Sequence, residues 1–235
     1  MDFYTITSLV AIAFLLMIGV EIVVCLGLGA VLLTVLTGTF SLENMGISAF
    51  TAIDLFPLLA MPLYILTGDL ITESGIARQL VRFARSIVGW VNGGLALTVL
   101  VASGMFAAIS GSNSATVAAM GRMLCPEMKK DGYPEDFAGA VTASGGTVGI
   151  IIPPSIVFVI YGVTAGVSVG DLFFAGILPG LAMILSMCAV AWLISRRNRW
   201  GTLTRFSIRE VLLRAWDAKL AFGATAIILA GIYGG

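Results

Sequence analysis

The stretch ISGSNSATVA, residues 109–118, places three serines, an asparagine and a threonine inside a segment that is otherwise apolar from residue 93 to residue 121. A helix needs roughly 20 apolar residues to cross the hydrocarbon of a bilayer once, so this segment has room for one crossing or for two short helices. Irregular backbone at membrane depth is tolerated only where it is buried in protein or lines a watery cavity. The polar run at residues 110–116 therefore predicts a site.

The composition predicts a multispanning membrane protein. Of 235 residues, 59% are hydrophobic and 11% are charged, against roughly 25% charged residues in soluble domains. The chain has no histidine, which removes the usual general base and most zinc sites. Its three cysteines have no paired spacing, and no GxxxxGK[ST] phosphate loop occurs. We expect no enzyme, no transition metal, no organic cofactor and no nucleic-acid partner.

The cations predict the path of the chain through the membrane. The thirteen Lys and Arg residues fall into three clusters, at residues 78–85, 122–130 and 196–219. Loops rich in Lys and Arg tend to be cytoplasmic. If the first two clusters are both inside, the segment between them enters and returns, so residues 93–121 predict a re-entrant hairpin with the polar run at its tip.

A second interruption lies in residues 137–167, which are long enough to cross but contain Ser144–Thr147, Gly149 and Pro153-Pro154. Proline removes a helix hydrogen bond and restricts the residue before it, so we expect a discontinuous helix. A short helix ending at midplane points its dipole there, and unwound backbone leaves carbonyls free. Hydroxyl and carbonyl oxygens suit sodium, and free amides suit a carboxylate. We expect the two breaks to meet and form one site.

The remaining segments predict the scaffold. Residues 74–91 set apolar positions against Arg78, Arg82 and Arg85 at helical spacing, which is typical of an interfacial helix, and residues 203–216 form a weaker second candidate. The N-terminal segment lacks the basic flank of a secretory signal, and we interpret it as a retained span. The other expected segments are two closely joined spans in 4–37, a cation-free loop at 38–53, and spans in 54–72, 172–195 and 220–235.

The pair of motifs SGSNSATVAA (110–119) and GIIIPPSI (149–156) resembles the large permease subunit of tripartite ATP-independent periplasmic (TRAP) transporters, with the resemblance strongest from residue 56 to residue 180. The resemblance implies an all-α polytopic protein, the first inverted repeat of an elevator-type transporter, whose second repeat we expect beyond this sequence. It implies scaffold spans and an arm helix in 1–92, transport-domain elements in 93–167, and a scaffold span, basic linker and final span in 168–235.

The same resemblance implies a permease of the bacterial inner membrane that uses a sodium gradient. It would import an organic acid, a C4-dicarboxylate or sialic-acid-like molecule, delivered by a periplasmic binding protein, and would work with a small four-helix membrane subunit. Pro153 and Pro154 would hold the helix break open. The implied sodium and substrate ligands are Ser110, Gly111, Ser112, Asn113 and Ser114 at the hairpin tip, and Thr142, Ser144, Gly145, Gly146, Thr147 and Gly149 in the unwound stretch.

Other readings of the same residues stay open at this point. Serine, threonine and glycine also serve close helix packing in membranes. A stand-alone sodium-coupled dicarboxylate symporter could use similar hairpins, and an ion channel could use a re-entrant loop as its filter. An intramembrane serine enzyme is disfavoured, because the lysines lie in basic loops away from the serines.

Overall fold

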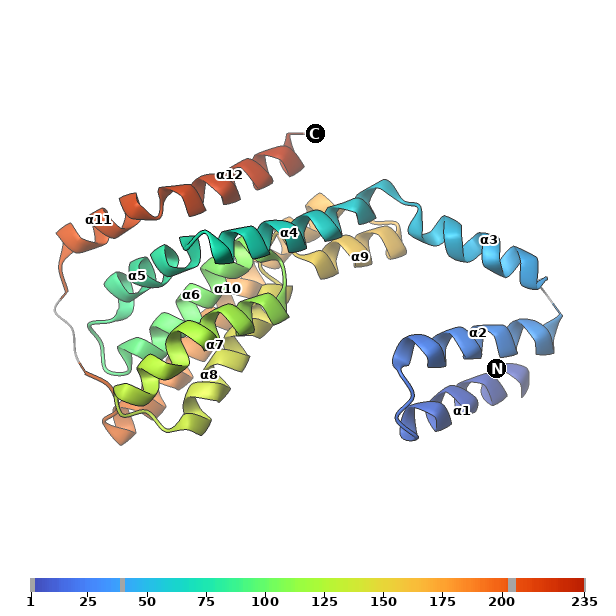
Figure 1. Ribbon diagram of the computed structural model, residues 1–235, viewed down its shortest axis with the longest axis horizontal. Coiled ribbons are helices and arrows are strands. Elements are labelled where there is room, and N and C mark those ends of the chain that lie inside the picture. The colour runs from blue at the N-terminus through green and yellow to red at the C-terminus, as the bar shows by residue number, and fades with distance from the viewer. Residues whose placement is uncertain (1–2, 39–40, 203–205, 235) are drawn as a thin grey trace. The chain divides into compact units, whose positions relative to one another are not determined.

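The computed structural model describes residues 3–38, 41–202 and 206–234, and every regular element in them is helical. The chain divides into two compact units, Met1–Leu55 and Phe56–Gly235. Figure 1 shows the smaller unit in blue and the larger one from teal to red. The predicted all-α class is confirmed.

The smaller unit contains α1 (Phe3–Met17), α2 (Ile22–Thr37) and α3 (Leu42–Ile53). The first two helices pack against each other across a short turn at Gly19, whose φ is +87°. This confirms the expected pair of closely joined helices. The expectation of a loop across residues 38–53 is wrong, because α3 occupies most of it. Ser41 caps that helix by accepting a hydrogen bond from the Asn44 amide at 3.2 Å.

The larger unit is built around one central helix, α6 (Gly94–Ser110), which is buried along almost its whole length. An apolar helix without a polar face requires neighbours on every side, and Leu100 and Phe106 lie at the centre of the resulting core. The neighbours and connecting elements are η1 (Phe56–Leu59), α4 (Ala60–Glu73), α5 (Ile76–Val88), α7 (Asn113–Lys130), α8 (Glu135–Thr147), η2 (Val148–Ile150), α9 (Ile156–Ala165), α10 (Val169–Asn198), α11 (Ile208–Asp217) and α12 (Lys219–Tyr233).

The amphipathic helix expected in residues 74–91 is confirmed as α5. Leu80 and Ala84 are buried against the core, whereas Arg78, Arg82 and Arg85 are exposed. The buried face packs on α6, so protein covers it. The second candidate is α11, which begins at Ile208, and residues 203–205 of that prediction lie outside the described residues.

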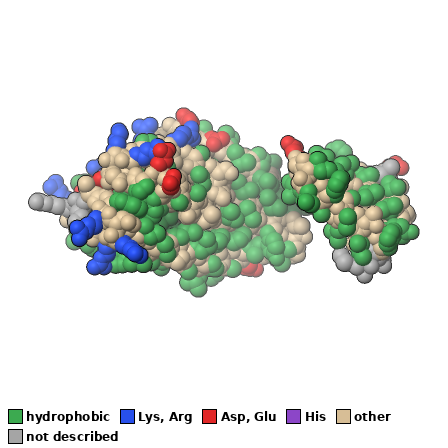
Figure 2. All heavy atoms as spheres, turned by 90° about the horizontal axis from the view of Figure 1, so that it is seen from below, with side chains coloured by type: hydrophobic (Ala, Val, Ile, Leu, Met, Phe, Trp, Pro, Cys, Tyr) green, Lys and Arg blue, Asp and Glu red, His purple; other side chains and the backbone are tan. Residues whose placement is uncertain are grey.

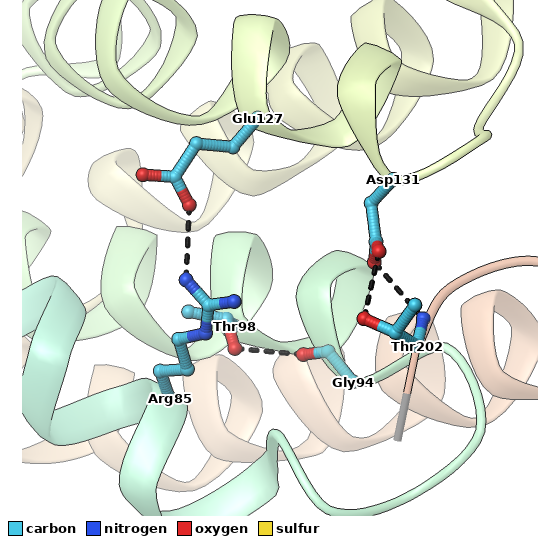
Figure 3. Close-up of polar contacts among 6 residues, drawn as sticks. All are labelled: Arg85, Gly94, Thr98, Glu127, Asp131 and Thr202. Atoms are coloured by element: carbon cyan, nitrogen blue, oxygen red, sulfur yellow. Dashed lines mark hydrogen bonds and ion pairs between the residues drawn. The ribbon is translucent and has the colours of Figure 1, made fainter. Parts of the chain in front are cut away.

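Polar contacts bring the three basic clusters to one end of the larger unit (Figure 3). Arg85, at the end of α5, donates to the Glu127 carboxylate of α7 at 3.1 Å. The Asp131 carboxylate, just after α7, accepts from the Thr202 amide at 3.1 Å and from its hydroxyl at 2.8 Å. Figure 2 shows Lys and Arg gathered at one end of this unit. The helices α6 and α7 therefore form a hairpin whose open end lies among the cations, as the charge pattern predicted.

The surface is apolar over much of both units (Figure 2). Phe174 and Leu178 on α10 are 71% and 77% exposed, and Ile227 on α12 is 75% exposed. In the described part of the chain, α10 alone is long and apolar enough to cross a membrane, and the bent pair α11–α12 passes if it is counted as one span. The 30 residues of α10 reach about 45 Å. The expectation of further crossings stays a prediction.

We expect the hairpin to return to the side from which it enters. In a variant whose native cysteines are replaced by serine, a cysteine at Arg82 and one at Lys130 should react with a membrane-impermeant thiol reagent from the same side of sealed vesicles, because the contact of Arg85 with Glu127 joins the two ends of the hairpin. A cysteine at Val167, at the far end of α9, serves as the control and should react from the other side. Labelling of positions 82 and 130 from opposite sides would contradict the hairpin.

Candidate functional site

The tip of the hairpin lies within the polar run. α6 ends at Ser110, Gly111 turns the chain at φ +60°, and Ser112 caps α7 by accepting from the Ala115 amide at 3.4 Å. The Thr116 hydroxyl donates to the Ser112 carbonyl at 2.7 Å and lies 3.4 Å from the Ser110 hydroxyl. The predicted turn is confirmed, and its hydroxyls hold one another in place.

The second interruption lies later in the chain than expected. α8 continues as α-helix through Thr147, so the prediction of unwound backbone from Thr142 to Thr147 is wrong. Glycine tolerates a helical conformation when neighbours hold it there, whereas a Pro-Pro pair lacks two amide donors. The chain tightens at η2 and breaks at residues 151–155, which include a cis peptide bond between Pro153 and Pro154. The predicted discontinuous helix is thus confirmed, with its break moved to the prolines.

The two interruptions meet. The Ile156 amide, at the start of α9, donates to the Gly111 carbonyl at 3.3 Å. A methyl group placed on Gly111 would lie 2.8 Å from the Pro154 carbonyl oxygen, and one on Gly149 would lie 3.3 Å from the Ser112 carbonyl oxygen. These glycines let backbone approach backbone. The expectation that the hairpin tip and the broken helix come together is confirmed.

Protein covers the back of this junction. A methyl group on Gly176 of α10 would lie 2.6 Å from the Ile151 carbonyl oxygen, and one on Gly180 would lie 2.7 Å from the Ile152 side chain. Ser155 closes the break by donating to the Ile150 carbonyl at 2.6 Å, and it caps α9 by accepting from the Phe158 amide at 3.4 Å. Irregular backbone therefore sits against helices, which is the condition for placing it in a membrane.

The structure separates the predicted ligands into two groups. Those at the junction are Ser110, Gly111, Ser112, Asn113, Gly146 and Gly149, beside the helix-break residues Pro153 and Pro154. The Gly146 backbone contacts the α7 face that carries Asn113 and Val117, and Gly145 faces Ser103 of α6 instead.

The remaining predicted ligands lie away from the junction or point out of it. Thr142 lies 3.2 Å from the Cys125 thiol, more than a turn back along α8. Ser144 lines a cavity of about 320 Å³ between α8 and α10. Ser114 and Thr147 are exposed.

Thr116 of the predicted polar run is fully buried and bonds to the tip. Two further residues near the junction, Gly68 and Ser155, were not predicted. Gly68 of α4 packs against Ser110. Ser155 follows the two prolines and precedes an apolar run, which is a helix-start signal that sequence reading can detect. Nothing local in the sequence identifies Gly68, because its role depends on a helix packed from elsewhere in the chain.

The junction offers neutral oxygen donors and helix ends. The C-terminal end of α6 and the end of η2 present carbonyls, and the N-terminal ends of α7 and α9 present amides. Within the described residues, no group of three His, Cys, Asp or Glu side chains could hold a metal ion. Ligands of this kind suit a hard monovalent cation on the carbonyl side and a carboxylate on the amide side.

Paired helix interruptions that bring opposite helix ends together are the arrangement of secondary transporters, in which half-helix ends hold substrate and coupling ions. The family profile described as "Tripartite ATP-independent periplasmic transporter, DctM component" matches residues 9–235. The chain belongs to this family, the large permease component of TRAP transporters.

Three curated relatives show the range of the family. The chain is 41% identical to the C4-dicarboxylate TRAP transporter large permease protein DctM of Pseudomonas aeruginosa, over 89% of this chain and 49% of the relative. It is 39% identical to the isethionate TRAP transporter permease protein DctMQ of Oleidesulfovibrio alaskensis, over 95% and 35%. It is 34% identical to the sialic acid TRAP transporter large permease protein SiaM of Vibrio cholerae, over 86% and 47%. The chain thus spans about half the length of these relatives or less, and they are permeases rather than enzymes.

Replacing Gly111 should destabilise the protein through contact with the broken helix. Gly111→Ala places a methyl group against the Pro154 carbonyl and forces alanine into left-handed backbone, which alone costs about 1–2 kcal/mol. Gly132→Ala is the matched control, because Gly132 has φ +86° with nothing within 4 Å of an added methyl group. In detergent, the thermal midpoint of Gly111→Ala should fall clearly below that of Gly132→Ala. Equal midpoints would show that a methyl group on Gly111 meets no close contact, and would contradict the packing of the hairpin tip on the broken helix.

Proposed function

We propose that this chain is part of a bacterial inner-membrane permease that imports an organic acid using a sodium gradient. A periplasmic binding protein would deliver the acid, a C4-dicarboxylate or sialic-acid-like molecule, and a small four-helix membrane subunit would complete the membrane complex. Membership of the DctM family supports the class of function, and the relatives named for C4-dicarboxylate and sialic acid support the class of substrate.

The hydrogen bond between Gly111 and Ile156 is the observation that carries the proposal. It joins the hairpin tip to the broken helix, two segments about 45 residues apart. Close packing of small residues would not by itself require interrupted helices, whereas here two helix ends and two helix starts converge on one point. Convergent ends of this kind concentrate partial charge, and partial charge is what an ion site requires.

Sodium would bind on the carbonyl side of the junction. Backbone carbonyls at the end of α6, with the Ser110 and Ser112 hydroxyls and the Asn113 amide oxygen, supply hard neutral oxygens. The carboxylate of the acid would bind at the amide-rich starts of α7 and α9. Because the sodium ion and the carboxylate attract each other, binding of either would raise the affinity for the other, which is the thermodynamic basis of coupling.

Transport would involve movement of residues 93–167 relative to the scaffold elements in 1–92 and 168–235. The junction lies inside that segment, so a bound ion and acid would travel with it. Small residues where α6 meets α10, such as Gly104 against Ile184, allow the two surfaces to lie close without interlocking polar groups.

A sodium-dependent rise in stability tests the ion site without knowledge of the substrate. The native-length permease that carries this sequence should melt at a higher temperature in NaCl than in equimolar choline chloride, because a ligand of the folded state stabilises it by RT ln(1 + [L]/Kd). Ser112→Leu should abolish that difference by filling the tip. Ser186→Leu, at an exposed serine of α10, should preserve it. If Ser112→Leu kept the full difference in melting temperature between NaCl and choline chloride, sodium would not bind at the hairpin tip.

Dependence on a delivery protein tests the tripartite part of the proposal. In proteoliposomes holding both membrane subunits, sodium-driven uptake of labelled succinate or sialic acid should require the periplasmic binding protein. Uptake of equal rate without it would instead identify a stand-alone symporter. Conduction of ions without saturable uptake would identify a channel.

A further inference from the structure

A basic and aromatic surface surrounds α11 and does not take part in the junction. Residues 196–219 contain seven Lys or Arg residues and only two acidic ones, Glu210 and Asp217. Arg214 uses its charge within the helix, pairing with Asp217 at 3.3 Å and lying 3.9 Å from Glu210. Arg197 and Arg209 are exposed, and neither forms an ion pair among the described residues. Among the described residues, this segment therefore has more cations than its two carboxylates can pair.

An apolar stripe of α11 lies beside these cations without a partner in the chain. Ile208, Leu212 and Trp216 follow one another at four-residue spacing and are 68%, 66% and 69% exposed. No residue of this helix is fully buried, although its other side faces α5. A stripe of this kind on a helix with a polar opposite face is typical of a helix that lies in a membrane interface.

The tryptophans mark the depth of that interface. All four in the chain lie within or next to the basic clusters at residues 78–85 and 196–219 in the sequence. Trp192 stacks under Arg196 at 5.1 Å, and Trp216 stacks under Lys219 at 4.6 Å. Trp90 packs on Phe206 at 5.6 Å, and Trp200 packs on Phe137 at 5.1 Å. Tryptophan gathers at the level of lipid head groups.

The backbone changes direction at the same level. α11 and α12 are separated by Ala218 alone and are bent by 58° relative to each other. α12 is apolar, with Ile227 exposed. A helix that lies along a head-group layer and then turns into hydrocarbon needs such a bend. In that placement Arg209, Trp216 and Lys219 would lie at the head groups, and Leu212 would reach toward the acyl chains.

From charge, stripe, tryptophans and bend together, we propose that α11, with Arg197 and Lys219 beside it, forms a surface that selects anionic phospholipid head groups. This inference rests on the proposed function in one respect, because the proposed function places the chain in a bilayer. Each cation near a charged membrane surface contributes about a fivefold preference, so the free cations here should concentrate anionic lipid around α11.

Quenching of tryptophan fluorescence by brominated lipids measures this preference directly. The native-length permease is reconstituted in phosphatidylcholine containing either brominated phosphatidylglycerol or brominated phosphatidylcholine. At 0.1 M salt, phosphatidylglycerol should be favoured severalfold, and the ratio should approach one at 1 M salt, where charges are screened. The variant R197Q/R209Q/K219Q should bring the ratio close to one already at 0.1 M salt. Its melting temperature in pure phosphatidylcholine serves as the folding check.

A matched pair of single variants separates local recognition from general charge. Arg209→Gln should lower the ratio, whereas Arg122→Gln, an equally exposed cation on α7, should leave it unchanged. Equal quenching by both lipids in the unaltered protein would overturn the lipid surface, as would protection of α11 by the small membrane subunit with no lipid preference. If neither brominated lipid quenched the fluorescence, α11 would not lie in the membrane interface at all. The sodium response of the junction is independent of all these outcomes.

Discussion

The arrangement of the larger unit depends on satisfying backbone polar groups where helices stop inside an apolar protein. At the hairpin tip and at the proline break, the chain leaves amides and carbonyls without intrahelical partners. The Gly111 carbonyl accepts from the Ile156 amide, and Ser112 and Ser155 cap the helices that restart. The proline break therefore supplies an amide donor and the hairpin tip supplies a carbonyl acceptor. This pairing explains why the two interruptions lie together rather than at separate depths.

Close approach of these segments requires glycine on three sides. Gly111 lies against Pro154, Gly149 lies against Ser112, and α10 presents Gly176 and Gly180 to the break. A side chain at these positions would separate the helices and expose the backbone that they protect. Packing and ion binding are thus not competing explanations of the small residues, because the packing creates the convergence of helix ends.

The two ends of the larger unit have different physical characters. The junction carries neutral oxygens and amides and lies among apolar helices. The opposite end carries the cations, the tryptophans and the ion pair between Arg85 and Glu127 (Figure 3). Charge is concentrated where water and head groups can solvate it, and it is kept away from the site, where an unpaired ion would be costly. Cations gathered at one end are what orients a membrane protein in its bilayer. The hairpin tip itself carries no charged side chain.

The sequence by itself determined the helical class, the hairpin turn at the polar run, the amphipathic α5 and the presence of a proline break, because each follows from local periodicity, charge and backbone chemistry. It misplaced the unwound segment, since Gly145 and Gly146 suit either a coil or a helix. In the folded chain both are helical, with Gly145 packed against Ser103 and Gly146 against Asn113. Tertiary structure alone decided that Thr142 and Ser144 lie apart from the tip, that Gly68 supports Ser110, and that Gly111 bonds to Ile156. These relations join residues distant in the chain, and no local pattern encodes them.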